Sequence, residues 1–177
     1  ESAQRIRSSL VERFGLLTII LLGENLISIV TGATHIKYFT AELVATVSLS
    51  LMIVFALWWV YFDFISHRKP RQKTNTRLTW IYLHLPLTTS IGLTAVGLLN
   101  VIEHPDHFTH IDRWFVVGPV TLFLTVAMLL IKTLDVQKEN FPLYEKGIIM
   151  SFVSAILLIL LGISNASLLP TLGLTLL

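Results

Sequence analysis

The chain has 177 residues, of which 54% are hydrophobic and only 14% are charged. Soluble domains carry about 25% charged residues, so this composition excludes a chain that covers its own surface with charge and points to the membrane. The absence of cysteine excludes disulfides and thiolate metal sites, and the formal net charge of +2 gives no sign of a nucleic-acid partner.

Five apolar segments are long enough to cross the roughly 30 Å of hydrocarbon in a bilayer. In chain order they are Phe14–Gly32, Ala41–Phe64, Leu78–Val101, Trp114–Leu134 and Gly147–Ile163, with Leu168–Leu177 as a candidate start of a truncated sixth. They should be helices, because backbone groups in lipid must pair within the segment and the alternation of barrel strands is missing. The sequence therefore predicts an all-α, polytopic transmembrane helical bundle.

We expect a single helical membrane domain over residues 1–177. The sequence starts without a methionine and stops within an apolar run. Both features predict that this domain is part of a longer chain.

The basic residues predict how the spans are oriented. Five of the thirteen Lys and Arg residues lie in the 66–77 loop between the second and third spans. Because basic loops stay in the cytoplasm, this loop and the N-terminus are predicted to be cytoplasmic. Trp58, Trp59 and Trp80 lie near the same ends of their spans, where tryptophan is typical of an interfacial anchor.

Glu24 falls close to the middle of the first span and is followed by Asn25. A carboxylate at that depth costs several kcal/mol unless it is paired, protonated or hydrated, and such residues often mark function. Arg13 shares its helical face but lies about 16 Å away along the axis, too far for a direct ion pair. Glu24 and Asn25 are therefore candidate transport or proton-relay groups, with hydrogen bonding between helices as the structural alternative.

Three further candidates lie near the predicted cytoplasmic ends of the spans. Arg13 and Asp63 should lie at similar depth, and His84 lies one to two turns into the third span. We expect them to form an inner gate or proton relay. Taken singly, Arg13 and Asp63 are more typical of a structural clamp, and His84 is more typical of an interhelical hydrogen-bond donor.

Two other carboxylates are interpreted as structural clamps, Glu12 at the start of the first span and Glu42 at the start of the second. Glu42 could meet Lys37 or Arg113, which are the two bases predicted on the outer side.

The outer loop holds His104, His107 and His110 at three-residue spacing. Three imidazoles at this spacing could bind Zn²⁺ or Cu²⁺. Pro105 interrupts the segment and no recognised metal motif is present, so a solvated polar loop is the preferred interpretation. No cofactor is predicted, and no phosphate-binding loop, serine-hydrolase motif or zinc-protease motif points to an enzyme.

Three motifs occur in order along the chain: VERFGLLTIILLGENL (residues 11–26), WWVYFDF (residues 58–64) and YLHLPL (residues 82–87). Together they resemble the bacterial low temperature requirement protein A (LtrA) family, and the resemblance weakens after Val101. It implies a polytopic protein of the bacterial inner membrane, with an additional N-terminal membrane half in which Glu24 could find its partner. It marks Glu12, Arg13, Glu24, Asp63 and His84 as typical of the family without assigning them a role.

The sequence favours a carrier or channel-like protein for a small solute or ion, with Glu24 as its midplane site and the lipid bilayer as its surroundings. The alternative is a non-transporting structural or assembly subunit of a larger membrane complex. Glu24 would then contact a neighbouring chain, either in a homo-oligomer or in a partner membrane subunit.

Overall fold

The computed structural model describes residues 2–36, 38, 40–66, 68–71, 74–135, 141–164 and 166–176. These residues form six α-helices and two short helices of other types, and no strand. The elements are α1 (Ser2–Thr34), α2 (Ala41–Tyr61), the π-helix η1 (Phe62–Ser66), α3 (Thr74–Glu103), the 3₁₀-helix η2 (Pro105–His107), α4 (His110–Thr133), α5 (Phe141–Ile163) and α6 (Leu168–Leu174).

Five helical segments are long and apolar enough to cross a membrane: Ser9–Thr34, Ala41–Ser66, Asn75–Glu103, His110–Thr133 and Tyr144–Ile163. The predicted bundle of five full spans is therefore confirmed. Each predicted range lies inside one of these segments, except that Leu134 directly follows α4. The short helix α6, with seven residues, occupies the place of the predicted sixth segment.

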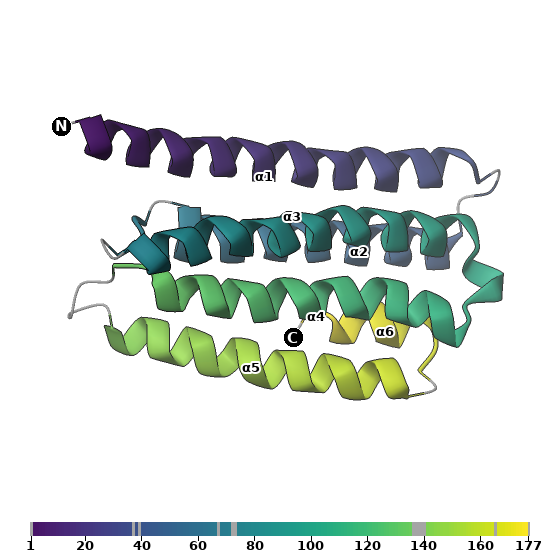
Figure 1. The fold of residues 1–177 in the computed structure, drawn as a ribbon. Coiled ribbons are helices and arrows are strands. Elements are labelled where there is room, and N and C mark those ends of the chain that lie inside the picture. Colours follow the sequence, from purple (N-terminus) through teal and green to yellow (C-terminus); the bar gives the residue numbers. More distant parts are fainter. Residues whose placement is uncertain are drawn as a thin grey trace.

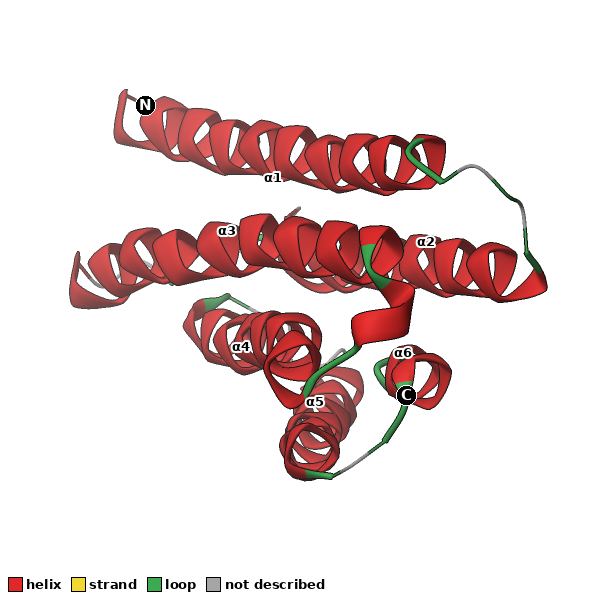
Figure 2. Ribbon diagram, turned by 90° about the vertical axis from the view of Figure 1, so that its right-hand side faces the viewer, coloured by secondary structure: helices red, strands yellow, loops and turns green. Residues whose placement is uncertain are grey.

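Helix α3 lies at the centre of the bundle, because α1 packs against one side of it and α4 against the other. In Figure 1, α1 forms one outer layer, α2 and α3 form the next, and α4, α5 and α6 lie beyond them. The view from the other direction preserves this order of layers (Figure 2). Helix α6 turns back from the end of α5 and packs against α2 and α4.

The interior of the bundle is apolar, with fully buried side chains such as Leu87, Leu98, Phe123 and Leu130. The outward faces of α1 and α5 are equally apolar. Ile20 on α1 is 66% exposed and Met150 on α5 is 68% exposed. Contiguous exposed apolar faces of this size are rare on soluble proteins, and a bilayer would cover them.

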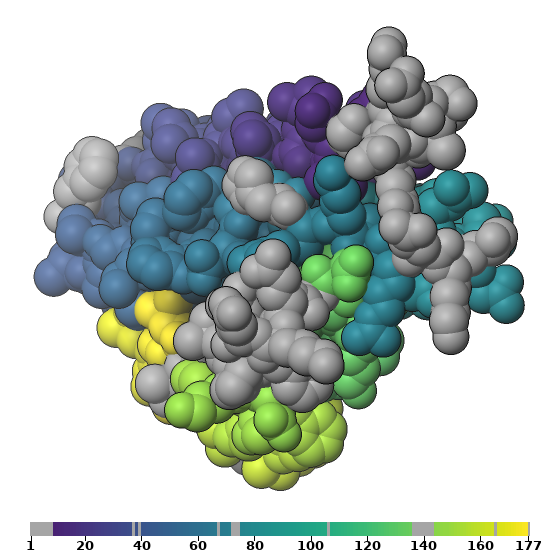
Figure 3. All heavy atoms as spheres, turned by 90° about the vertical axis from the view of Figure 1, so that its left-hand side faces the viewer, coloured from purple at the N-terminus to yellow at the C-terminus, as the bar shows by residue number. Residues whose placement is uncertain are grey.

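At one end of the bundle, two backbone hydrogen bonds and one bond from the Arg71 side chain tie the α2–α3 connection to the end of α4. Arg71 N donates to Thr133 O at 3.0 Å, Asp135 N donates to Lys69 O at 3.0 Å, and Arg71 Nε donates to Leu134 O at 3.1 Å. We call this end, where α1, α3 and α5 begin, the basic end. Figure 3 views the bundle from it, with α1 at the top and α5 at the bottom.

Among the described glycines, Gly97 has the least room for a side chain. A Cβ atom on this residue would collide with the backbone carbonyl of Phe115 on α4. Gly23 and Gly92, by contrast, have no atom within 4 Å of such a Cβ. Small residues at helix interfaces let backbones approach closely in membranes, so Gly97 sets the distance between α3 and α4.

We predict that Gly97→Ala lowers the stability of the folded protein in detergent by about 1–3 kcal/mol, because α3 and α4 must move apart. Thermal unfolding followed by tryptophan fluorescence measures this change. Gly92→Ala on the same helix is the matched control and should unfold at or above the wild-type temperature. Equal unfolding temperatures for the two variants would show that the close approach is not needed.

Candidate functional site

Helix α1 presents a carboxylate outwards at mid-depth. Glu24 lies about 22 Å from the start and about 15 Å from the end of the span Ser9–Thr34. Its side chain is exposed on the face that carries Ile20 and Ile27, which are 66% and 60% exposed. No hydrogen bond or ion pair joins Glu24 to a described residue. Glu24 thus lies in the middle third of its helical span, and no described residue supplies it with a partner.

The next residue, Asn25, points into the bundle and is completely buried. Its Nδ2 donates to Leu21 O at 2.8 Å within α1 and to Ile91 O at 3.1 Å across the interface with α3. Its Oδ1 is buried and has no described partner. Because successive helical residues are 100° apart, an inward Asn25 turns Glu24 away from the interior.

His84 lies deep between α1, α2 and α3, and is also completely buried. Its ring centroid lies 4.3 Å from that of Phe14, 4.2 Å from that of Trp80 and 6.2 Å from that of Tyr61. Its Nδ1 lies 2.8 Å from the carbonyl oxygen of Trp80, so Nδ1 carries the hydrogen and donates. This hydrogen bond joins two residues of α3, whereas His84 was expected to donate to a neighbouring helix.

Four buried polar atoms in the interior have no hydrogen-bond partner among the described residues. They are Asn25 Oδ1, Thr46 Oγ1, Trp80 Nε1 and His84 Nε2, and we call these residues the polar seam. They come from α1, α2 and α3. An unpaired polar atom in an apolar interior costs free energy unless water or another ligand satisfies it. The four atoms are spread along the bundle, because α2 and α3 begin at opposite ends and Thr46 and Trp80 each lie within two turns of the start of their helix.

Arg13 and Asp63 both lie at the basic end and both are exposed. No ion pair within 4.0 Å joins them, so the expected clamp between them is not formed in the described part of the chain. Glu12 is exposed beside Arg13 and likewise has no ion-pair partner there. His84 packs against Phe14, which directly follows Arg13, but among the described residues no hydrogen bond or ion pair joins His84 to Arg13 or Asp63.

At the opposite end, Arg113 has a role that sequence reasoning missed. It is only 5% exposed and donates to the carbonyl of Ser164 and, at 2.6 Å from Nη2, to that of Ala166. The guanidinium carbon also lies 5.6 Å from the ring centroid of Phe108. Arg113 therefore latches the α5–α6 turn to the start of α4. The only sequence signal for this role was that Arg113 is one of just two bases predicted to lie on the outer side.

The expected contact between Glu42 and Arg113 is wrong, because the guanidinium is engaged by the carbonyls of the latch. The other proposed partner, Lys37, lies outside the described residues. Glu42 is exposed in the first turn of α2, where a negative charge is favoured by the helix dipole.

Two carboxylates at the α3–α4 connection, Glu103 and Asp112, form hydrogen bonds with other side chains. His35 Nδ1 lies 2.8 Å from Glu103 Oε1, which joins the ends of α1 and α3. His104, His107 and His110 are exposed, and no three metal-ligating side chains converge among the described residues. Thr109 and Asp112 form a capping box that begins α4.

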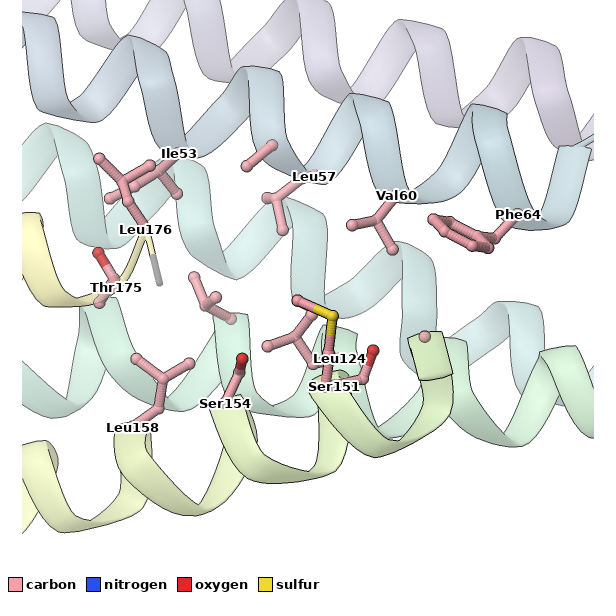
Figure 4. A pocket seen from close by; sticks show the side chains of 14 residues that line it. Ile53, Leu57, Val60, Phe64, Leu124, Ser151, Ser154, Leu158, Thr175 and Leu176 are labelled. Atoms are coloured by element: carbon pink, nitrogen blue, oxygen red, sulfur yellow. The ribbon is translucent and has the colours of Figure 1, made fainter. Parts of the chain in front are cut away.

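A separate cavity of about 220 Å³ lies between α2, α4, α5 and the end of α6. Figure 4 shows Leu57, Val60 and Phe64 on one side and the hydroxyls of Ser151 and Ser154 on another. No ionisable residue lines it, and Glu24 lies on a different helix. The cavity is thus apolar space within the bundle and is distinct from the polar seam.

A family model described as bacterial low temperature requirement A protein (LtrA) matches residues 5–177. No match was found among curated proteins or among solved structures. The last of the three sequence motifs ends at Leu87, and the family match extends well beyond it, through the part of the chain after Val101 where the resemblance weakened.

We predict that Arg113→Gln destabilises the turn between α5 and α6, because buried carbonyls lose charged donors at a cost of about 1–3 kcal/mol. Thermal unfolding and limited proteolysis at this turn measure the loss. Lys132→Gln, an exposed base at the other end of α4, should behave as wild type. An Arg113→Gln protein that resists heat and protease as well as this control would contradict the latch.

Proposed function

The chain belongs to the bacterial low temperature requirement A family, and we propose that it is a carrier or channel-like membrane protein for a small solute or ion. The observation that carries the proposal is the outward carboxylate of Glu24, at mid-depth on an apolar helix face. A charge in that place costs several kcal/mol when lipid alone surrounds it. It is therefore expected to face water, a bound ion, a proton or another protein surface.

In this proposal the pathway runs along the outer face of α1, and Glu24 is the group that exchanges a proton or a cation. Asn25 is a positioning residue, because its bond to Ile91 O keeps Glu24 turned towards the pathway. Arg13 and Asp63 are exposed at the basic end, where a solute would enter or leave. Arg13 and Asp63 do not form an ion pair with each other, so both charges remain available to the solute.

His84 and the other members of the polar seam lie on the inner side of α1. The unpaired Nε2 of His84 is an acceptor in the neutral ring, because Nδ1 of the same ring already donates to Trp80 O. Water bound along the seam would connect such acceptors to donors such as Trp80 Nε1. The proposal assigns His84 to proton movement beside the pathway.

We predict that Glu24→Gln reduces proton or cation flux by about tenfold or more, because the amide cannot carry the exchangeable charge. Flux is measured in reconstituted vesicles with an internal pH-sensitive dye, under imposed proton, Na⁺ or K⁺ gradients. The wild-type protein should exceed empty vesicles under at least one gradient.

Glu42→Gln is the control, since it removes an exposed carboxylate from the end of a span. It should retain wild-type flux. If folded Glu24→Gln protein also retains it, or if wild-type vesicles are no leakier than empty ones, the transport proposal is wrong.

A second function, that of a structural or assembly subunit, is favoured by the apolar surroundings of Glu24. Leu16, Ile20 and Ile27 are 60%, 66% and 60% exposed on α1 and would pack against a neighbouring membrane helix. Purification in mild detergent distinguishes the two. The subunit function is favoured if a stoichiometric partner purifies with the wild-type protein and is lost in Glu24→Ala, and if the wild-type protein shows no flux under any gradient.

We propose in addition that the basic end faces the cytoplasm of a bacterial inner membrane, on the positive-inside bias of the loops. The cysteine-free chain allows single reporters, Lys69→Cys at the basic end and His107→Cys at the opposite end. In intact spheroplasts, a membrane-impermeant maleimide should label His107→Cys and should spare Lys69→Cys until the membrane is opened. Labelling of Lys69→Cys but not of His107→Cys in intact spheroplasts would show that the basic end faces away from the cytoplasm.

A further inference from the structure

A groove of about 460 Å³ runs between α1 and η1 at the basic end. Its polar end is lined by Glu12, Ser66 and Lys69, and its apolar part by Leu16, Ile19 and Phe62. We propose that this groove binds a phospholipid whose headgroup carries both a phosphate and a primary ammonium, namely phosphatidylethanolamine. The proposal is independent of the transport function.

The groove has the polarity of a bound phospholipid along its length. Glu12, Leu16 and Ile19 follow one another on the same face of α1, so the lining runs about 10 Å from the rim into the span. Charged and hydroxyl groups stand at the rim, and only apolar side chains follow at greater depth. A headgroup would lie at the first part and an acyl chain along the second.

Gly15 keeps the floor of the groove open where α1 crosses η1. A Cβ atom on Gly15 would lie 3.5 Å from Ser66 Oγ, so any longer side chain would fill the space between the two helices. The π-helix η1 forms the other wall with Phe62 and Ser66. Short π-helical segments often occur at functional sites, because the wider turn redirects side chains.

The two charges at the rim have opposite signs and are not paired with each other. Glu12 and Lys69 are both exposed, and no ion pair within 4.0 Å joins them in the described part of the chain. Lys69 and the hydroxyl of Ser66 suit a phosphate, and Glu12 suits a cation. A headgroup with both signs matches this pair better than a purely anionic headgroup, which Glu12 would repel.

The chemistry of the cation site favours a primary ammonium. Such a group has three N–H donors for the carboxylate of Glu12. The trimethylammonium of phosphatidylcholine has no donor and is typically held by several aromatic faces. Among the described residues, Phe62 is the only ring that lines the groove.

Native mass spectrometry of the intact chain in detergent tests the proposal, with phosphatidylethanolamine, phosphatidylcholine and phosphatidylglycerol of identical acyl chains. The wild-type protein should bind phosphatidylethanolamine about threefold to fivefold more tightly than the other two, as expected for exposed charge pairs. Glu12→Gln should remove this preference. Lys69→Gln should weaken all three lipids, since it acts on the shared phosphate.

Two matched controls lie at the same end of the bundle and outside the groove, Glu145→Gln and Lys132→Gln. They should bind lipid as the wild type does, and unfolding temperatures show whether all variants are folded. Gly15→Leu adds a steric test and should weaken all three lipids without altering charge. The proposal is wrong if the wild-type protein binds the three lipids equally or prefers phosphatidylglycerol. It is also wrong if Glu12→Gln and Lys69→Gln bind lipid as the controls do.

Discussion

A single amide determines how the first helix faces the rest of the molecule. Asn25 Nδ2 donates to Ile91 O from a completely buried position, and this bond fixes the rotation of α1 against α3. Since Glu24 is the adjacent residue, the same bond directs a carboxylate away from the bundle and towards the surrounding membrane. The charged group on α1 therefore lies on the face that points away from the bundle, and the face that packs against α3 carries the amide.

The two ends of the bundle are held by different means. At the basic end, backbone bonds of Lys69 and Arg71 join the α2–α3 connection to the end of α4. At the opposite end, one buried guanidinium, that of Arg113, binds the carbonyls of the α5–α6 turn. Between these ends the helices meet through apolar contacts and the close approach at Gly97. Helix α1 is tied to α3 by the hydrogen bonds of Asn25 with Ile91 and of His35 with Glu103, and it has smaller contacts with α2 and η1.

This arrangement separates two kinds of polar group on opposite sides of α1. The polar seam lies inside and offers neutral hydrogen-bonding atoms, whereas Glu24 lies outside and offers a charge. At the basic end, charges of both signs gather at the surface, where α1 meets η1. Such a division lets a neutral interior keep the helices packed while charged groups remain accessible at the surface.

The number, type and approximate bounds of the spans could be predicted from the sequence, because apolar length and backbone pairing in lipid are properties of each segment alone. The mid-depth position of Glu24 followed in the same way. The direction in which Glu24 points, the separation of Arg13 from Asp63, and the engagement of Arg113 by carbonyls of the α5–α6 turn did not follow. They depend on which helices are neighbours and how each is rotated, and those are decided by contacts between distant segments, such as Asn25 with Ile91 and Gly97 with Phe115.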